Sequence, residues 1–302
     1  MRPPQQQADT EHNRFDPTVF SWFMTALAGE WRLIREECRP GPMQMALDEV
    51  AAETVSAGGP ATIRTYRWDP SCLTLGYSQA PDTVDWEACA RAGVDVTRRR
   101  TGGGGIYHDH VGDIAYSIAV DANDVPGELL EAYHLLCAPV LDAFARLGVD
   151  ADYVDETVPA LYHPACYLRE LHPAHDIVAD GRKIAGNAQY RTREAVVQHG
   201  SLTYAVEAAA HLDSFTDPPV SAATVRDRVV GIDELADVDG ATAVDRATAV
   251  DRLEAALADW VTGGGGTLDR DGAWTDDELA RARELVETRY CDDEWVRQRP
   301  GT

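Results

Sequence analysis

Four short segments of the chain carry residue types that could bind an anion or take part in chemistry. The first is RRRTGGGGIYHD (98–109), in which four glycines follow a predicted strand. Successive glycine amides can converge on one anion, because no Cβ blocks the approach. Arg98–Arg100 add positive charge at the same place, which favours a phosphate ligand. The segment matches neither the P-loop nor the dinucleotide pattern. The alternative is a flexible glycine turn without a ligand.

The second segment, DGRKIAGNAQ (180–189), holds Lys183, the only lysine among 27 basic residues. A lysine ammonium is a compact charge that can contact a carboxylate, a phosphate or a developing oxyanion. Gly186 lets another backbone pass close by, and Asn187 and Gln189 can orient a ligand. The alternative is that a drift of composition toward arginine left one lysine by chance.

Two further segments carry a histidine and a cysteine. QHGSL (198–202) places His199 beside Gly200, where the imidazole can donate to a ligand, although a lone histidine in a strand is more often structural. HPACYLREL (163–171) contains Cys166. The six cysteines form no C-x-x-C pair and match no zinc or disulfide spacing, so we expect reduced thiols and no protein-held metal.

The charge of the chain excludes several classes of partner. The 302 residues carry a formal net charge of −24, which argues against nucleic acid and against anionic membranes. The acidic excess resembles that of proteins from a salt-loaded, halophilic cytoplasm, where salt screens self-repulsion. The N-terminus has no apolar signal region, and no apolar stretch is long enough to span a membrane. We therefore expect a soluble cytoplasmic protein.

The pattern along the chain predicts an α+β fold with one mixed or antiparallel sheet and flanking helices. We expect a polar lead-in over 1–25 and a single domain over 26–302, with a helical, acidic C-terminal segment in which Gly263–Gly266 is a loop. The predicted helices are a first one around Met43–Val50, then 83–94 and 127–149. The predicted strands are two paired strands in 61–79 divided at Asp69-Pro70, the strand before the glycines, 113–120, a hairpin in 174–192 around Asp180-Gly181, and 195–206.

Taken in order, these segments resemble the lipoate–protein ligase and octanoyltransferase superfamily, whose catalytic domain is related in fold to biotin–protein ligases. The resemblance rests on the glycine run, on GRKIAGNAQYR and on QHGSL. It also includes MALDEV (45–50), LTLGYSQ (73–79) and the closing segment RELVETRYCDDEW (283–295). It covers roughly residues 30 to 296, and its ordered motifs are jointly specific.

The resemblance implies a lipoate–protein ligase that works in two half-reactions. ATP, arriving with Mg²⁺, activates lipoate to lipoyl-AMP, and the lipoyl group then passes to a lysine of a lipoyl-carrier domain. That domain would belong to a 2-oxoacid dehydrogenase complex or be the glycine cleavage carrier protein. Lys183 would be the catalytic residue, stabilising charge on the acyl carbonyl and the phosphate. The implied substrate- and nucleotide-binding residues are Arg99, Thr101, Gly102, Gly103, Gly104, Gly105, Ile106, Tyr107, His108, Lys183, Gly186, Asn187, His199 and Gly200.

Two alternatives to this reading stay open. In the transferase branch of the superfamily a cysteine accepts octanoyl from acyl carrier protein without ATP, and Cys166 stands where that nucleophile is found. That branch usually has an arginine in the glycine run, which favours the ligase here. The other alternative is a non-catalytic module that binds an acyl group or a nucleotide. An accessory C-terminal domain is expected to be absent or to lie on a separate polypeptide, so a ligase could act together with a separate accessory subunit.

Overall fold

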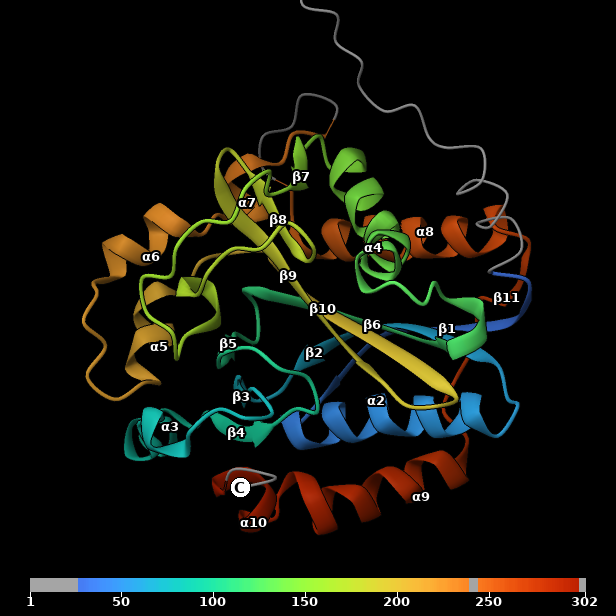
Figure 1. Ribbon diagram of the computed structural model, residues 1–302, viewed down its shortest axis with the longest axis horizontal. Coiled ribbons are helices and arrows are strands. Elements are labelled where there is room, and N and C mark those ends of the chain that lie inside the picture. The colour runs from blue at the N-terminus through green and yellow to red at the C-terminus, as the bar shows by residue number, and fades with distance from the viewer. Residues whose placement is uncertain (1–26, 239–243, 299–302) are drawn as a thin grey trace, which may run out of the picture.

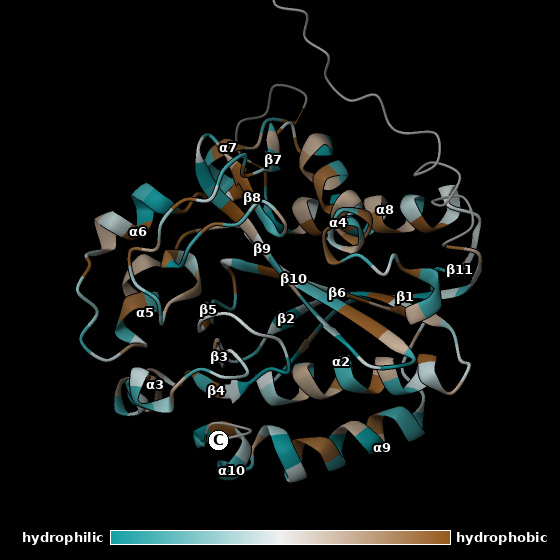
Figure 2. Ribbon diagram, in the orientation of Figure 1, coloured by the Kyte–Doolittle hydropathy of each residue, from teal (hydrophilic) through white to brown (hydrophobic). Residues whose placement is uncertain are grey.

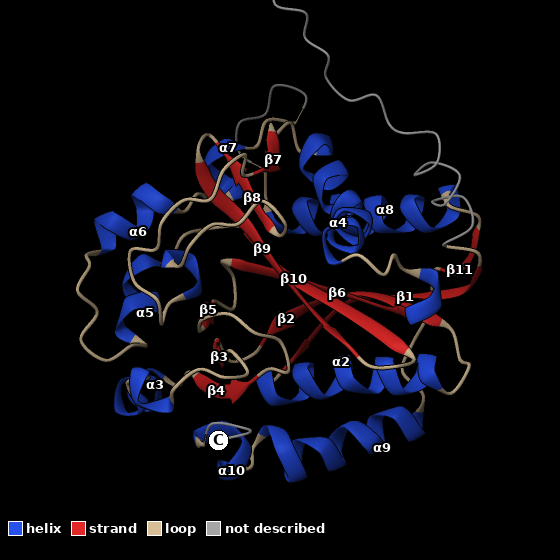
Figure 3. Ribbon diagram, viewed as in Figure 1, coloured by secondary structure: helices blue, strands red, loops and turns tan. Residues whose placement is uncertain are grey.

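The structure is a computed structural model that describes residues 27–238 and 244–298. The predicted polar lead-in over 1–25 therefore lies outside the described residues. Two β-sheets and the helices around them make up the described part, with the larger sheet running through the middle (Figures 1 and 3). This arrangement confirms the predicted α+β class with a mixed sheet and flanking helices. Within the described residues, none of the helices is long and apolar enough to cross a membrane.

The larger sheet has eight strands in the order β11-β1-β2-β6-β10-β9-β8-β7. The pairings β11–β1 and β1–β2 are parallel, and all the others are antiparallel. Its strands are β1 (Gly29–Arg39), β2 (Ala61–Trp68), β6 (Asp113–Asp121), β7 (Ala151–Tyr153), β8 (Asp176–Ala179), β9 (Arg182–Arg191), β10 (Ala195–Thr203) and β11 (Gly266–Asp269).

Helices cover both faces of the larger sheet (Figure 1). On one face α4 (Leu129–Arg146) and α8 (Arg246–Gly263) bury a core with β6 and β10, and on the other α2 (Gly41–Ser56) and α9 (Asp276–Leu285) bury a second core. Because both faces are covered, β6 reads as a continuous run of buried residues. The outer helices α3 and α6 carry hydrophilic residues (Figure 2).

The smaller sheet has the order β4-β3-β5 and holds the glycine run between two of its strands. It consists of β3 (Cys72–Leu75), β4 (Asp95–Arg98) and β5 (Ile106–His108). The predicted pairing of the two strands in 61–79 is wrong, because β2 pairs within the larger sheet and β3 within the smaller one. The chain leaves the larger sheet at Asp69-Pro70, where proline offers no N–H to continue a ladder.

Short helices pack around the smaller sheet and close the chain. They include α3 (Trp86–Ala92), capped by Asp85 and ended by Gly93 in the left-handed conformation. The others are α5 (Ala208–Asp213), α6 (Ala222–Arg228), α7 (Ile232–Leu235), the π-helical turn η4 (Val286–Tyr290), α10 (Asp293–Arg297) and the 3₁₀ turns η1 (Pro81–Thr83), η2 (Ala122–Asp124) and η3 (Cys166–Leu168).

Two turns show where local sequence decides the fold and where it does not. The hairpin predicted around Asp180-Gly181 forms as β8 and β9, with both turn residues at positive φ, 49° and 69°. The glycine run at 263–266 leads into β11, which pairs with β1 instead of being only a loop between helices. The sequence around this four-residue edge strand shows no periodic pattern. The strand forms because it pairs with a partner that lies more than 200 residues earlier in the chain.

Candidate active site

The glycine loop follows β4 and is held in place by the buried Arg99, which is only 3 % exposed. The Arg99 guanidinium donates to the backbone carbonyls of Gly102 and Gly104, each at 2.7 Å, and of Thr74 at 2.9 Å. Burial lowers the pKa of Arg99. Gly103 has a φ of +96°, a conformation that favours glycine. The loop therefore turns its carbonyls toward a buried cation.

The other two arginines of the run leave this place. Arg98 donates to the carbonyl of Gly76 at 2.7 Å and to that of Val296 in α10 at 3.0 Å. Arg100 pairs with Glu49 of α2, with Nη1 3.1 Å from Oε1. The expectation that three arginines gather into one phosphate site is therefore wrong, because successive side chains of an extended segment point to opposite sides.

Arg99 also anchors a chain of hydrogen bonds that ends on α2. Its Nε donates to Thr101 Oγ1 at 3.0 Å, and Thr101 Oγ1 lies 2.8 Å from His199 Nε2. His199 Nδ1 lies 2.8 Å from Asp48 Oδ2. The Asp48 carboxylate can only accept, so Nδ1–H of His199 donates to it, while Nε2 shares a hydrogen bond with the threonine hydroxyl. Both ring nitrogens of His199 are thus occupied by protein groups.

A second chain of hydrogen bonds leaves Arg99 in parallel. Thr74 Oγ1 accepts from Arg99 Nη1 at 3.2 Å and lies 3.0 Å from His108 Nε2. His108 Nδ1 lies 2.8 Å from Asp113 Oδ2, and the ring stacks on Trp68 at 4.1 Å. Burial lowers the pKa of His108, which favours the neutral ring. Both nitrogens of this histidine are occupied as well.

Cys166 faces the glycine loop from the turn η3. Gly105 N–H donates to the carbonyl of Pro164 at 2.7 Å, and Cys166 N–H donates to the carbonyl of Gly105 at 2.8 Å. A Cβ on Gly104 would lie 2.7 Å from the Pro164 oxygen and 3.0 Å from the Cys166 nitrogen. The glycines thus let the cysteine-bearing segment approach the loop closely.

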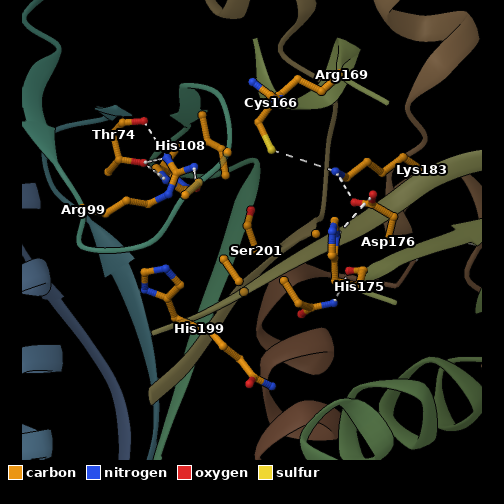
Figure 4. A pocket seen from close by; sticks show the side chains of 18 of the residues that line it. Thr74, Arg99, His108, Cys166, Arg169, His175, Asp176, Lys183, His199 and Ser201 are labelled. Atoms are coloured by element: carbon orange, nitrogen blue, oxygen red, sulfur yellow. Dashed lines mark hydrogen bonds and ion pairs between the residues drawn. The ribbon is translucent and has the colours of Figure 1, made fainter. Parts of the chain in front are cut away.

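Lys183 lies beside Cys166, on the second strand of the β8–β9 hairpin. Its Nζ is 2.6 Å from Asp176 Oδ1 and 4.0 Å from the Cys166 sulfur (Figure 4). Burial alone would lower the pKa of Lys183, but the Asp176 carboxylate raises it above its ordinary value. Burial would raise the pKa of Asp176, yet Lys183 holds it below its usual range. The pair is therefore an ammonium and a carboxylate, with the ammonium presented to the thiol.

These side chains enclose a cavity of about 260 Å³. Apolar and aromatic groups form much of its wall, including Met45, Tyr66, Trp68, Ile106 and Tyr133. The sequence-predicted residues that line it are Arg99, Gly102, Gly103, Ile106, His108, Cys166, Lys183, Gly186, Asn187, His199 and Gly200. Segments separated by more than 100 residues in the chain thus meet at one opening.

Four of the predicted binding residues lie outside the lining of this cavity. Thr101 is buried behind it, between Arg99 and His199. Gly104 and Gly105 face the segment that carries Cys166 and the ring of Phe215. The Tyr107 hydroxyl donates to Asp109 at 3.2 Å, away from the cavity. Strand alternation explains this last placement, since Tyr107 lies between the two cavity-lining residues of β5.

Several lining residues were missed by the sequence reasoning. Asp176 is one, although hairpin parity gives a signal, because Val178 opposes Lys183 and Asp176 lies two residues from Val178 on the same face. Tyr66 and Trp68 are two residues apart in β2 and therefore share one face, which is also a signal in the sequence. The Asp48 carboxylate gives no such signal, because its role depends on the contact with His199 from a distant strand.

Comparison with known proteins places these features in a family. The sequence model of the lipoyl protein ligase A/B catalytic domain matches residues 40–258. The octanoyltransferase LipM of Brevibacillus brevis is 32% identical over 282 residues, which span 88% of this chain and 98% of that protein. The octanoyltransferase LipM of Bacillus subtilis is 28% identical, over 88% of this chain and 97% of its own length.

Solved structures share the fold at lower identity. A bipartite lipoate protein ligase from Thermoplasma acidophilum, described with its E2 lipoyl domain, has a TM-score of 0.71 at 21% identity, covering 91% of this chain and 98% of that one. A lipoate-protein ligase A bound with ATP has a TM-score of 0.70 at 23% identity, covering 90% of this chain and 99% of that one. These likenesses concern the fold.

Proposed function

Since this chain belongs to the lipoyl protein ligase A/B catalytic domain family, we propose from that premise that it is an octanoyltransferase acting through Cys166. The observation that carries the proposal is the Cys166 sulfur at the wall of the cavity, 4.0 Å from the Lys183 ammonium. A neighbouring cation can stabilise the negative charge that develops on the carbonyl oxygen and on the leaving sulfur during acyl transfer. The LipM relatives, at 28–32% identity over most of this chain, support the same activity.

The reaction has two acyl-transfer steps. In the first, the Cys166 thiolate attacks the carbonyl carbon of an octanoyl thioester on acyl carrier protein; the new C–S bond forms, the donor's C–S bond breaks, and the donor leaves as its thiolate. In the second, the neutral amine of a lysine on a lipoyl-carrier domain attacks the octanoyl-Cys166 thioester; the C–N bond forms, the C–S bond breaks, the nitrogen loses one proton, and the Cys166 thiolate is released. Lys183 Nζ stabilises the oxyanion in both steps, an electrostatic contribution of a few kcal/mol.

The cavity suits the acyl chain better than a triphosphate. Its apolar side chains can cover an eight-carbon chain that ends at Cys166. The cation of Arg99 is committed to the loop carbonyls, and Arg98 and Arg100 bind protein groups outside the cavity. Arg169, which also lines the cavity, donates to the carbonyl of His163 at 3.2 Å. The ATP-dependent ligase predicted from the glycine run therefore has less support than its transferase alternative.

The two enzymes are distinguished by their donors. The protein is incubated with a lipoyl-carrier domain in high salt, as its acidic composition recommends, either with ATP, Mg²⁺ and lipoate or with octanoyl–acyl carrier protein. We expect the carrier domain to gain the mass of an octanoyl group in the second mixture alone. Cys166→Ser should abolish this product, while Cys38→Ser, an exposed cysteine on β1, should not.

Other outcomes have clear meanings. Product formed from ATP and lipoate, and unaffected by Cys166→Ser, would overturn the proposal in favour of the ligase. Absence of product from both donors would favour a binding module without turnover. The same mixtures also test the carrier domain as partner, because the acyl group must appear on its lysine.

A further inference from the structure

Asp176 connects Lys183 to a third titratable residue, His175. The Asp176 oxygen Oδ1 receives Lys183, and its Oδ2 lies 3.4 Å from His175 Nδ1 (Figure 4). His175 lines the same cavity as Cys166, and its side chain is 35 % exposed, against 2 % for Lys183. One carboxylate therefore holds a buried ammonium on one side and a more open imidazole on the other.

His175 differs from the two other histidines of the cavity in its bonding. His108 and His199 each use both ring nitrogens in contacts with a threonine and an aspartate. The ring of His175 is held by Asp176 and by its neighbours Tyr133 and His172, whose ring centroids lie 5.6 and 5.3 Å away. In the part of the chain that the structure describes, no group is hydrogen-bonded to His175 Nε2. This nitrogen is available to a substrate.

The second transfer step needs a proton acceptor at this place. When a neutral lysine amine attacks the octanoyl-Cys166 thioester, its nitrogen becomes positively charged and must lose one proton before the amide can form. Lys183 is already an ammonium beside Asp176, and Cys166 is blocked by the acyl group. The ring nitrogens of His108 and His199 are occupied. Among the three histidines of the cavity, His175 is the one whose Nε2 is open to a substrate.

We propose that His175 is the general base of transfer to the carrier lysine, an inference that rests on the octanoyltransferase function. Its Nε2 accepts the proton from the attacking nitrogen, while Nδ1–H donates to Asp176, which stabilises the imidazolium. The C–N bond forms, the C–S bond breaks, and the electron pair remains on sulfur as a thiolate facing Lys183. The imidazolium then releases its proton to solvent through its exposed edge.

The test separates the two steps in a single turnover. Cys166 is first acylated by octanoyl–acyl carrier protein, the donor is removed, and the carrier domain is added while the intact masses of both proteins are followed. In His175→Gln we expect acylation within twofold of the wild-type rate and transfer slowed about 10²–10⁴-fold. His163→Gln is the matched control, because this histidine is exposed and lies outside the cavity lining, and it should transfer normally. Imidazole should restore part of the transfer rate in His175→Ala.

Each result decides the matter. Three results would contradict the role of His175 but leave the octanoyltransferase function standing. They are transfer at the wild-type rate by His175→Gln, an equal loss of rate in both steps, and a transfer rate of His175→Ala that imidazole does not raise. Normal acylation in the same variant shows that the fold and the Cys166–Lys183 pair are intact. A wild-type protein that forms no acyl-enzyme overturns the octanoyltransferase function, and this inference falls with it.

Discussion

The two walls of the cavity differ in how their polar groups are bonded (Figure 4). The glycine-loop wall consists of Arg99, Thr74, His108 and His199, with Thr101 buried behind it. The cysteine wall consists of Cys166, Lys183, Asp176 and His175. On the glycine-loop wall the buried Arg99 guanidinium donates hydrogen bonds to the hydroxyls of two threonines. Each hydroxyl is hydrogen-bonded to a histidine, whose other ring nitrogen contacts an aspartate carboxylate. On the cysteine wall, among the residues that the structure describes, the sulfur is hydrogen-bonded only to the ammonium at 4.0 Å, and His175 Nε2 is open.

The difference indicates a division of labour between holding geometry and doing chemistry. A buried polar network whose members are all satisfied is rigid, because breaking any bond leaves an unpaired buried group. A group that is to react must instead keep a lone pair or a proton for the substrate. Substitutions on the glycine-loop wall should therefore act mainly on stability, and those on the cysteine wall mainly on rate.

The largest effect is expected for Lys183→Arg on the cysteine wall. A guanidinium keeps the charge beside Asp176 but is planar and wider, so it cannot place a compact cation next to the sulfur. We expect octanoyl transfer to fall about 10³-fold, the size of effect seen when an oxyanion donor is removed. The measurement is the initial rate on the carrier domain, with urea unfolding as the check on stability. A rate within tenfold of wild type would remove Lys183 from catalysis.

On the glycine-loop wall, Arg99→Lys should act in the opposite way. An ammonium has three N–H groups, so at least two of the five acceptors of Arg99 on Thr74, Thr101, Gly102 and Gly104 lose their donor. Each buried acceptor left unpaired costs about 1–3 kcal/mol, so we expect the free energy of unfolding to fall by about 3 kcal/mol.

The control for Arg99→Lys is Arg100→Lys, whose guanidinium binds Glu49 outside the cavity and is 31 % exposed. It should cost well under 1 kcal/mol, as partly exposed ion pairs do. If Arg99→Lys unfolds at the wild-type urea concentration yet stops acyl transfer, Arg99 contacts substrate, and the division between the walls fails.

The sequence predicts most residues of the glycine-loop wall, whereas it misses Asp176 and His175 of the cysteine wall. Lys183 and Asp176 lie on one hairpin, whose turn residues and strand parity are local signals. The glycine run likewise indicates that another group approaches the backbone closely, but it does not identify that group. The two hydrogen-bond chains join Asp48, Thr74 and His199, which come from three separate parts of the chain. No periodicity encodes such a meeting, because it depends on which strands pair.

The same limit explains the errors in the predicted fold. Helix ends and hairpins follow from caps, glycines and turn residues, and these predictions held at α3 and at the β8–β9 turn. Partner choice between distant strands did not follow, so β3 was assigned to the wrong sheet and β11 was missed. The side chains of Arg98–Arg100 point to different places because side chains alternate along an extended segment. The charge of the three residues does not reveal this.

A smaller effect, on stability in acid, is expected at Asp48, where the hydrogen-bond chain through Thr101 and His199 ends. Burial would raise the pKa of Asp48, but Arg64 and the hydrogen bond with His199 lower it from 3.8 to about 2. Since the folded pKa is the lower one, this contribution is complete above about pH 4 and is lost as the pH falls toward 2. It amounts to about 2 kcal/mol. Urea unfolding from pH 6 to 2 should show this loss in the wild type and in the exposed control Glu87→Gln, but not in Asp48→Asn.

The smallest effect is expected where the two walls touch, at Gly104. An added Cβ would meet the Pro164 oxygen and the Cys166 nitrogen, so in Gly104→Ala the cysteine-bearing segment must move by a few tenths of an ångström. We expect a loss of about 1 kcal/mol of stability, together with slower acylation of Cys166. A Cβ on Gly102 would have no heavy atom within 4 Å, so Gly102→Ala should leave the unfolding midpoint unchanged or slightly raised.

This pair of alanine variants tests whether the walls are coupled at all. If the rigid loop aims the sulfur, Gly104→Ala slows acylation by more than its stability loss would explain, because the folded protein itself places Cys166 less well. If acylation stays at the wild-type rate while stability falls, the loop merely supports the fold. Cys166 would then owe its reactivity to Lys183 alone, and the hydrogen bond from Cys166 N–H to the Gly105 carbonyl would be structural.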